Sequence, residues 1–157
     1  MKIIGKPTIN PLMFYSGKIS GYVTWIILLG YILNVIPLTG VQIKIFQVIS
    51  ILLVVIGLII VSISLVNLGN STRLGLPTEN TTLKTSGVYH FSRNPIYFGF
   101  NLFTIASMLY CINIVVLILG IYSIITYHLI ILGEERFLET RFGDDYLRYK
   151  MKVRRYI

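Results

Sequence analysis

The sequence predicts an all-α integral membrane protein: about four transmembrane helices, the last two a tight hairpin, and an amphipathic C-terminal helix on the cytoplasmic side. The chain is 55% hydrophobic and 13% charged, whereas soluble domains carry about 25% charged residues. Its apolar runs approach the roughly 20 residues that a helix needs to cross a bilayer. Segments in lipid must satisfy their own backbone polar groups, so helices are expected despite the many β-branched residues.

The first half of the chain contains two predicted spans. The first covers about Tyr22 to Leu38 and closes at Pro37, and the second covers about Ile45 to Val66. Residues 1–66 would then form an N-terminal two-span region within a single domain of residues 1–157.

The second half contains an apolar run from Ile96 to Leu132 that is too long for one span and suits two short ones. Pro95 fits the first turn of the third span, because its missing N–H would be unpaired there anyway. That span ends near Tyr110, and the fourth covers about Ile114 to Leu132. The two spans return the chain to one membrane face.

The tail from Glu134 to Ile157 follows, and Gly143 is expected to interrupt it. The helix after Gly143 is rich in basic residues and could lie on anionic lipid headgroups. These residues are Arg148, Lys150, Lys152, Arg154 and Arg155.

Charge predicts the orientation. With four spans, every Lys and Arg except Lys44 falls on the side of the two termini, and the positive-inside rule places that side in the cytoplasm. The formal charge of +8 is therefore explained by the orientation of the chain in the membrane, and no nucleic-acid partner is expected. One cysteine, Cys111, and two histidines supply no metal-ligand set, so no metal site is expected. Residue usage rich in Ile, Asn, Lys and Tyr suggests a prokaryotic cytoplasmic membrane.

Arg93 and Glu134 are far apart in sequence, but the hairpin would bring them to the same membrane face. Asn94 and Pro95 fix a helix N-terminus beside Arg93, and such an end favours an anion. An arginine there can bind a carboxylate through two hydrogen bonds, although a snorkelling interfacial arginine is the ordinary alternative. With Glu134 as the pole for an ammonium, the pair suits an amino-acid-like ligand such as S-adenosylmethionine.

Other residues near this face could take part in chemistry. Tyr89 and Tyr97 are typical of an aromatic belt, yet they could also face a sulfonium through cation–π contacts. Arg93, Glu135 and His128 are the predicted catalytic residues. Glu135 or His128 could remove a proton from a substrate, and each also has a structural explanation as a helix-exit charge or an interfacial histidine. Familiar glycine-rich nucleotide motifs and phosphate-binding loops are missing from the sequence.

Several segments resemble the isoprenylcysteine carboxyl methyltransferase family, and the related phospholipid N-methyltransferases share part of the pattern. The similarity covers the C-terminal half, from Leu83 to Ile157. The segments that carry it are Leu83-Lys84-Thr85-Ser86-Gly87-Val88-Tyr89, Ser92-Arg93-Asn94-Pro95-Ile96-Tyr97-Phe98-Gly99, Glu134-Glu135-Arg136-Phe137-Leu138 and Phe142-Gly143-Asp144-Asp145-Tyr146-Leu147-Arg148-Tyr149-Lys150.

The resemblance implies a membrane methyltransferase that uses S-adenosylmethionine, with residues 67–157 as the cofactor-binding core. The acceptor would be a lipophilic molecule from the bilayer, of the isoprenylcysteine carboxylate type or a lipid amine. Glu134 would hold the amino-acid moiety of the cofactor. The residues that would line the cofactor are Thr82, Leu83, Lys84, Tyr89, Asn94, Pro95, Ile96 and Tyr97.

The chain departs from the family pattern at two positions. Asn94 stands where histidine is commoner, and it can still donate a hydrogen bond. Ile130 stands where the eukaryotic prenylcysteine enzymes have an arginine tied to the substrate carboxylate. Lipid amines and other lipophilic nucleophiles therefore remain open as acceptors.

Two other hypotheses fit parts of the sequence. The first is a membrane reductase of the sterol-reductase type, which would bind NADPH. The second is a non-catalytic membrane protein whose basic tail binds anionic lipid. The oligomeric state has no signal in the sequence.

Overall fold

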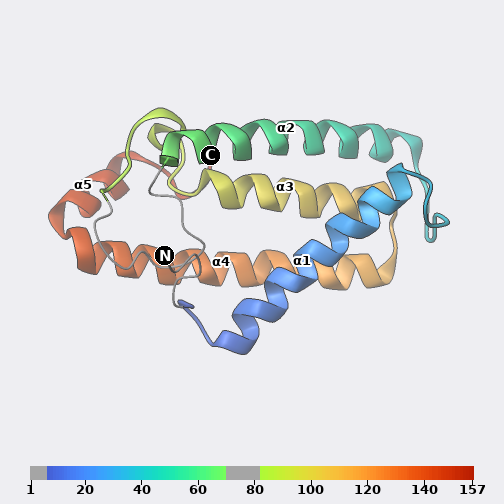
Figure 1. Cartoon of the computed structure of the whole chain (residues 1–157), viewed down its shortest axis with the longest axis horizontal. Coiled ribbons are helices and arrows are strands. Elements are labelled where there is room, and N and C mark those ends of the chain that lie inside the picture. The colour runs from blue at the N-terminus through green and yellow to red at the C-terminus, as the bar shows by residue number, and fades with distance from the viewer. Residues whose placement is uncertain (1–6, 70–81) are drawn as a thin grey trace.

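The computed structural model of the chain describes residues 7–69 and 82–157, and within these residues every regular element is a helix (Figure 1). The predicted all-α membrane fold is therefore confirmed. The helices are α1 (Pro11–Ile32), α2 (Lys44–Leu68), the short 3₁₀ helix η2 (Gly87–His90), α3 (Pro95–Tyr110), α4 (Ile114–Phe142) and α5 (Asp144–Lys152).

Helix α3 is the centre of the bundle. It packs against α1, α2 and α4, and Figure 1 shows α2, α3 and α4 running alongside one another while α1 crosses α4 obliquely. Helix α5 follows α4 at the end of the bundle where α3 begins. The start of α3, the end of α4 and the C-terminal residues therefore meet at one end of the molecule.

Three of the described helices are long and apolar enough to cross a membrane: α1, α2 and α4. Helix α3 has 16 residues, or about 24 Å at 1.5 Å per residue, against a hydrocarbon core of about 30 Å. The structure thus shows a membrane protein with three candidate spans, and a fourth span through α3 stays a prediction.

Helix α1 begins and ends earlier than the sequence predicts. It covers Pro11–Ile32 rather than the predicted Tyr22–Leu38. Its start has a strong local signal, because the Asn10 side chain accepts a hydrogen bond of 2.9 Å from the backbone N–H of Leu12 and Pro11 occupies the first turn. The prediction was wrong because the residues before Tyr22, which include Gly17 and Gly21, do not form a continuous apolar run.

Those glycines are packing positions. Gly17 and Gly21 are buried in α1, and a Cβ atom on either would collide with Thr126 or Ser123 of α4. Small residues four apart let membrane helices approach closely. Helices α1 and α4 therefore form one tightly packed pair.

Helices α2 and α3 form a second pair of the same kind. A Cβ atom on Gly57 would lie 3.1 Å from the carbonyl oxygen of Gly99, and a Cβ atom on Gly99 would lie 3.1 Å from the carbonyl oxygen of Gly57. These two glycines face each other across the contact, and only hydrogen atoms fit between the backbones there.

The tail folds back onto the start of α3. Gly143 ends α4 with φ of 51°, which interrupts the helix as predicted. Helix α5 stops at Lys152, so Arg154 and Arg155 lie outside the helix in which the sequence placed them. Ser92 and Arg154 form a parallel bridge, and the backbone N–H of Arg93 donates to the Arg154 carbonyl oxygen at 3.0 Å.

Candidate functional site

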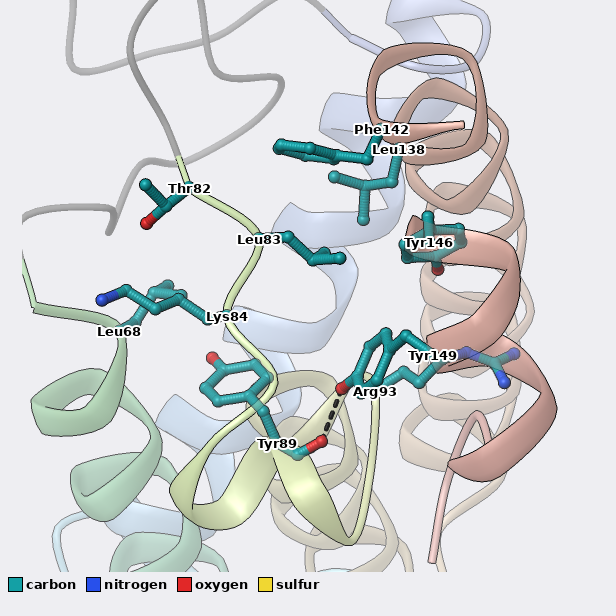
Figure 2. Close-up of a pocket in the computed structure, with 10 residues that line it drawn as sticks. All are labelled: Leu68, Thr82, Leu83, Lys84, Tyr89, Arg93, Leu138, Phe142, Tyr146 and Tyr149. Atoms are coloured by element: carbon teal, nitrogen blue, oxygen red, sulfur yellow. Dashed lines mark hydrogen bonds between the residues drawn. The ribbon is translucent and has the colours of Figure 1, made fainter. Parts of the chain in front are cut away.

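Two neighbouring cavities lie at the end of the bundle where α3 begins. The first, which we call the outer cavity, has a volume of about 130 Å³ and lies between residues 82–84, η2 and the α4–α5 corner (Figure 2). It is lined by Leu68, Thr82, Leu83, Lys84, Tyr89, Arg93, Leu138, Phe142, Tyr146 and Tyr149.

The second, the inner cavity, has a volume of about 240 Å³ and lies among the four long helices. The two cavities share Leu68, Tyr89, Arg93 and Leu138 as lining residues, so they are adjacent chambers of one site. The remaining residues of the inner cavity are Lys18, Tyr22, Leu65, Asn94, Pro95, Ile96, Tyr97, Phe100 and Glu134.

Glu134 is the acidic group of the inner cavity. Its Oε1 atom accepts a hydrogen bond of 2.6 Å from the Tyr97 hydroxyl, which fixes the carboxylate against α3. Its Oε2 atom receives no hydrogen bond from the described residues. This oxygen is available to a cation inside a largely apolar chamber, where electrostatic attraction is stronger than in water.

Glu135 faces a different set of groups. Its carboxylate is 4% exposed and forms ion pairs of 2.9 Å with both Arg93 and Arg155. Asn94 also donates to Oε1 at 3.2 Å. Both oxygens are saturated, so this carboxylate joins α3, α4 and the tail and is not free to accept a proton. The hydrogen bonds to Glu135 also raise the pKa of Arg155.

The Arg93 guanidinium is equally occupied. Nε and Nη2 donate to Glu135, and Nη1 donates to the carbonyl oxygens of Lys150 and Val153. In Figure 2 the guanidinium points past Tyr149, toward α5 and away from Leu83. The expected pairing of Arg93 with Glu134 is therefore not what the structure shows, because Arg93 pairs with the next residue along.

Aromatic side chains form part of the wall of the outer cavity. Tyr149 donates a hydrogen bond of 2.5 Å to the Tyr89 carbonyl oxygen (Figure 2), which holds α5 over η2. Burial raises the pKa of Tyr149 to about 12 and also raises that of Tyr89, so both are neutral donors at physiological pH. Flat apolar groups of a ligand can stack against such rings.

The structure brings the predicted cofactor-binding residues together. Thr82, Leu83, Lys84 and Tyr89 line the outer cavity. The others line the inner cavity: Asn94, Pro95, Ile96, Tyr97 and Glu134. Of the three residues predicted to be catalytic, Arg93 borders both cavities and Glu135 lies behind them in its ion-pair network.

His128 lies elsewhere. It lines a lateral groove of about 540 Å³ between α3 and α4, which shares no lining residue with the inner cavity. Its Nδ1 atom is 2.9 Å from the Tyr156 hydroxyl, and the two rings stack. The structure therefore does not place His128 beside Glu134, although both are on α4.

Residues of the first two helices are the part of the site that sequence reasoning missed. Lys18 and Tyr22 of α1 and Leu65 and Leu68 of α2 line the inner cavity. The available signal was Lys18, a lone charge in what proves to be a long apolar helix. Such a residue commonly faces a polar cavity.

Ile130, at the position of the family's substrate arginine, is fully buried in an apolar cluster with Phe14 and Tyr127. No polar group of a ligand can be recognised from this position. At position 130 the structure therefore has no side chain that could bind a substrate carboxylate as that arginine would.

The comparisons with known proteins identify the family. No curated protein matches the chain significantly. Residues 45–145 match the sequence model of the phospholipid methyltransferase family, a stretch that contains α2, α3, α4 and most of both cavities. The chain is thus a membrane protein that belongs to the phospholipid methyltransferase family.

Proposed function

We propose that the protein transfers a methyl group from S-adenosylmethionine to a lipid amine at the inner face of the membrane. The observation that carries the proposal is the position of Glu134: its carboxylate, fixed by Tyr97 at 2.6 Å, faces a cavity that continues into an aromatic chamber. The family supports methyl transfer, and the identity of cofactor and acceptor is our inference.

The residues present fit this cofactor. The outer cavity offers tyrosine and phenylalanine rings for an adenine and the backbone of residues 82–84 for its polar edge. The inner cavity offers Glu134 for the α-ammonium group. When bound, S-adenosylmethionine supplies an electrophilic methyl group that the acceptor nitrogen takes as the S–C bond breaks, leaving a neutral thioether.

A lipid amine reacts in its neutral form, so the proton of its ammonium form has to pass to water or to a base before the methyl group is transferred. A neutral amine becomes a methylammonium when it gains a methyl group, so no proton has to leave during the step itself. Glu135 is saturated by Arg93 and Arg155, and His128 lies in the lateral groove. The residues of the site therefore act by binding, aligning the partners and excluding water.

A prenylcysteine acceptor is supported less well, because Ile130 occupies the position of the arginine that the resemblance assigns to its carboxylate. The lipid would reach the inner cavity from the bilayer and the cofactor from the cytoplasm. This orientation follows from the basic charge at the end of the bundle that holds the site.

The test is equilibrium binding of S-adenosylmethionine and, separately, of NADPH to the protein in nanodiscs of phosphatidylethanolamine and phosphatidylglycerol. We expect saturable binding of S-adenosylmethionine alone, followed by transfer of its labelled methyl group into the extracted phosphatidylethanolamine. Binding of NADPH alone would favour a reductase. Binding of neither in a lipid environment would favour the non-catalytic hypothesis.

A further inference from the structure

Lys18 is a cation of the inner cavity that lies outside the ion-pair network of Glu135. It lies in the second turn of α1 and lines the cavity together with Glu134 of α4. Its Nζ atom lies 4.1 Å from the centre of the Phe14 ring. No hydrogen bond or ion pair of this ammonium is found in residues 7–69 and 82–157, although it attracts Glu134 across the cavity.

The second cation on the cavity wall cannot take the same role. Arg93 uses its guanidinium for Glu135 and for two carbonyl oxygens of the tail, and its side chain is only 7% exposed. An ammonium in an apolar chamber is costly when its N–H groups find no acceptor, even with an aromatic ring beside it. A ligand that supplies an anionic oxygen would remove this cost.

We propose that Lys18 binds an anionic oxygen of a ligand in the inner cavity, beside the cofactor ammonium that Glu134 holds. The proposal rests on the proposed function and deepens it. Two groups could supply this oxygen: the carboxylate at the methionine end of the cofactor, and the phosphate of an aminophospholipid that enters the cavity beside it. Both offer an anionic oxygen to the same ammonium.

The experiment compares Lys18→Met and Lys18→Arg with the wild-type protein in nanodiscs. Lys44→Met serves as the matched control, because Lys44 is an exposed lysine at the start of α2, at the far end of the bundle. Cofactor affinity is measured by titration calorimetry without an acceptor lipid, and KM is measured for phosphatidylethanolamine diluted into phosphatidylcholine. Thermal unfolding of each variant reports whether the fold is kept.

A charged hydrogen bond of this kind changes affinity by about tenfold or more. If Lys18 binds the cofactor carboxylate, Lys18→Met weakens cofactor binding by about that factor and Lys18→Arg restores part of it. If Lys18 binds the lipid phosphate, cofactor affinity stays unchanged and KM for the lipid rises.

Unchanged cofactor affinity together with an unchanged KM in a folded Lys18→Met protein would overturn the role of Lys18, leaving it as an interfacial lysine. Failure of the wild-type protein to bind S-adenosylmethionine is a different result, because it overturns the proposed function itself. An equal loss of affinity in Lys44→Met and in Lys18→Met would also count against the proposal. The loss would then follow from the change in net charge and not from the position of Lys18 in the cavity.

Discussion

Glu134 and Glu135 are adjacent in the chain, yet their carboxylates belong to different environments. Glu134 accepts from Tyr97 and faces the inner cavity, whereas Glu135 is clamped between Arg93 and Arg155. A ligand can therefore reach the first and not the second. The following predictions separate a binding role from a structural one at these two positions.

Glu134→Gln should weaken S-adenosylmethionine binding by about tenfold or more, because the amide replaces a charged hydrogen-bond acceptor for the ammonium group. The fold should be kept, since Tyr97 can still donate to the amide oxygen. Titration calorimetry measures the affinity. Glu139→Gln is the control on the same helix, because Glu139 pairs with Lys150 outside both cavities. Wild-type affinity in Glu134→Gln would refute the assignment.

Arg93→Met should destabilise the protein by about 3–5 kcal/mol, because it leaves one side of a buried carboxylate uncompensated. Glu135→Gln should act in the same direction, and the double variant should lose less than the sum of the two. Denaturation of the purified protein measures the effect. Asp145→Asn is the control, since its ion pair with Arg148 is largely exposed and such pairs contribute little. If the double variant lost as much stability as the two single variants together, Arg93 and Glu135 would not belong to one ion-pair network.

His128→Gln should leave cofactor affinity and the rate of methyl transfer close to those of the wild-type protein. The reason is geometric: His128 faces Tyr156 in the lateral groove and not the inner cavity. Tyr156→Phe is the companion variant, because it removes the same contact from the other side. A folded His128→Gln protein that binds the cofactor and transfers no methyl group would show that His128 does act in the reaction.

Gly57→Leu should destabilise the helix bundle by about 1–3 kcal/mol, because a side chain there must displace Phe103 and the backbone of Gly99. Ile59→Leu in the same helix is the control, since Ile59 is exposed on the outer surface of the bundle. Thermal unfolding in detergent measures the difference. Equal unfolding temperatures for the two variants would contradict the close contact between α2 and α3.

Much of the fold could be predicted because its signals are local. Pro95 and Gly143 mark helix ends in the structure as they do in the sequence, and the apolar run of α2 differs by only a few residues from the prediction. The start of α1 could not be predicted in the same way. In a membrane bundle a glycine commonly marks the place where another helix approaches, and that neighbour is not visible in the local sequence.

The candidate site was predictable in part of its residues and not in its pairing. The predicted cofactor-binding residues and Arg93 line the two cavities, whereas Glu135 and His128 line neither. Which glutamate faces Arg93 was not predictable, because successive helical residues point about 100° apart and the sequence does not show how α4 is rotated about its own axis. Lys18 was missed because its helix was expected to begin after it.

Close contacts at glycines group the four long helices into two pairs, α1 with α4 and α2 with α3. Gly17 and Gly21 bind α1 to α4, while Gly57 and Gly99 bind α2 to α3. Lys18 and Glu134 of the inner cavity come from the first pair, and Leu65 and Tyr97 come from the second. The inner cavity therefore lies where the two helix pairs meet, and the hydrogen bond from Tyr97 to Glu134 joins the pairs at its wall.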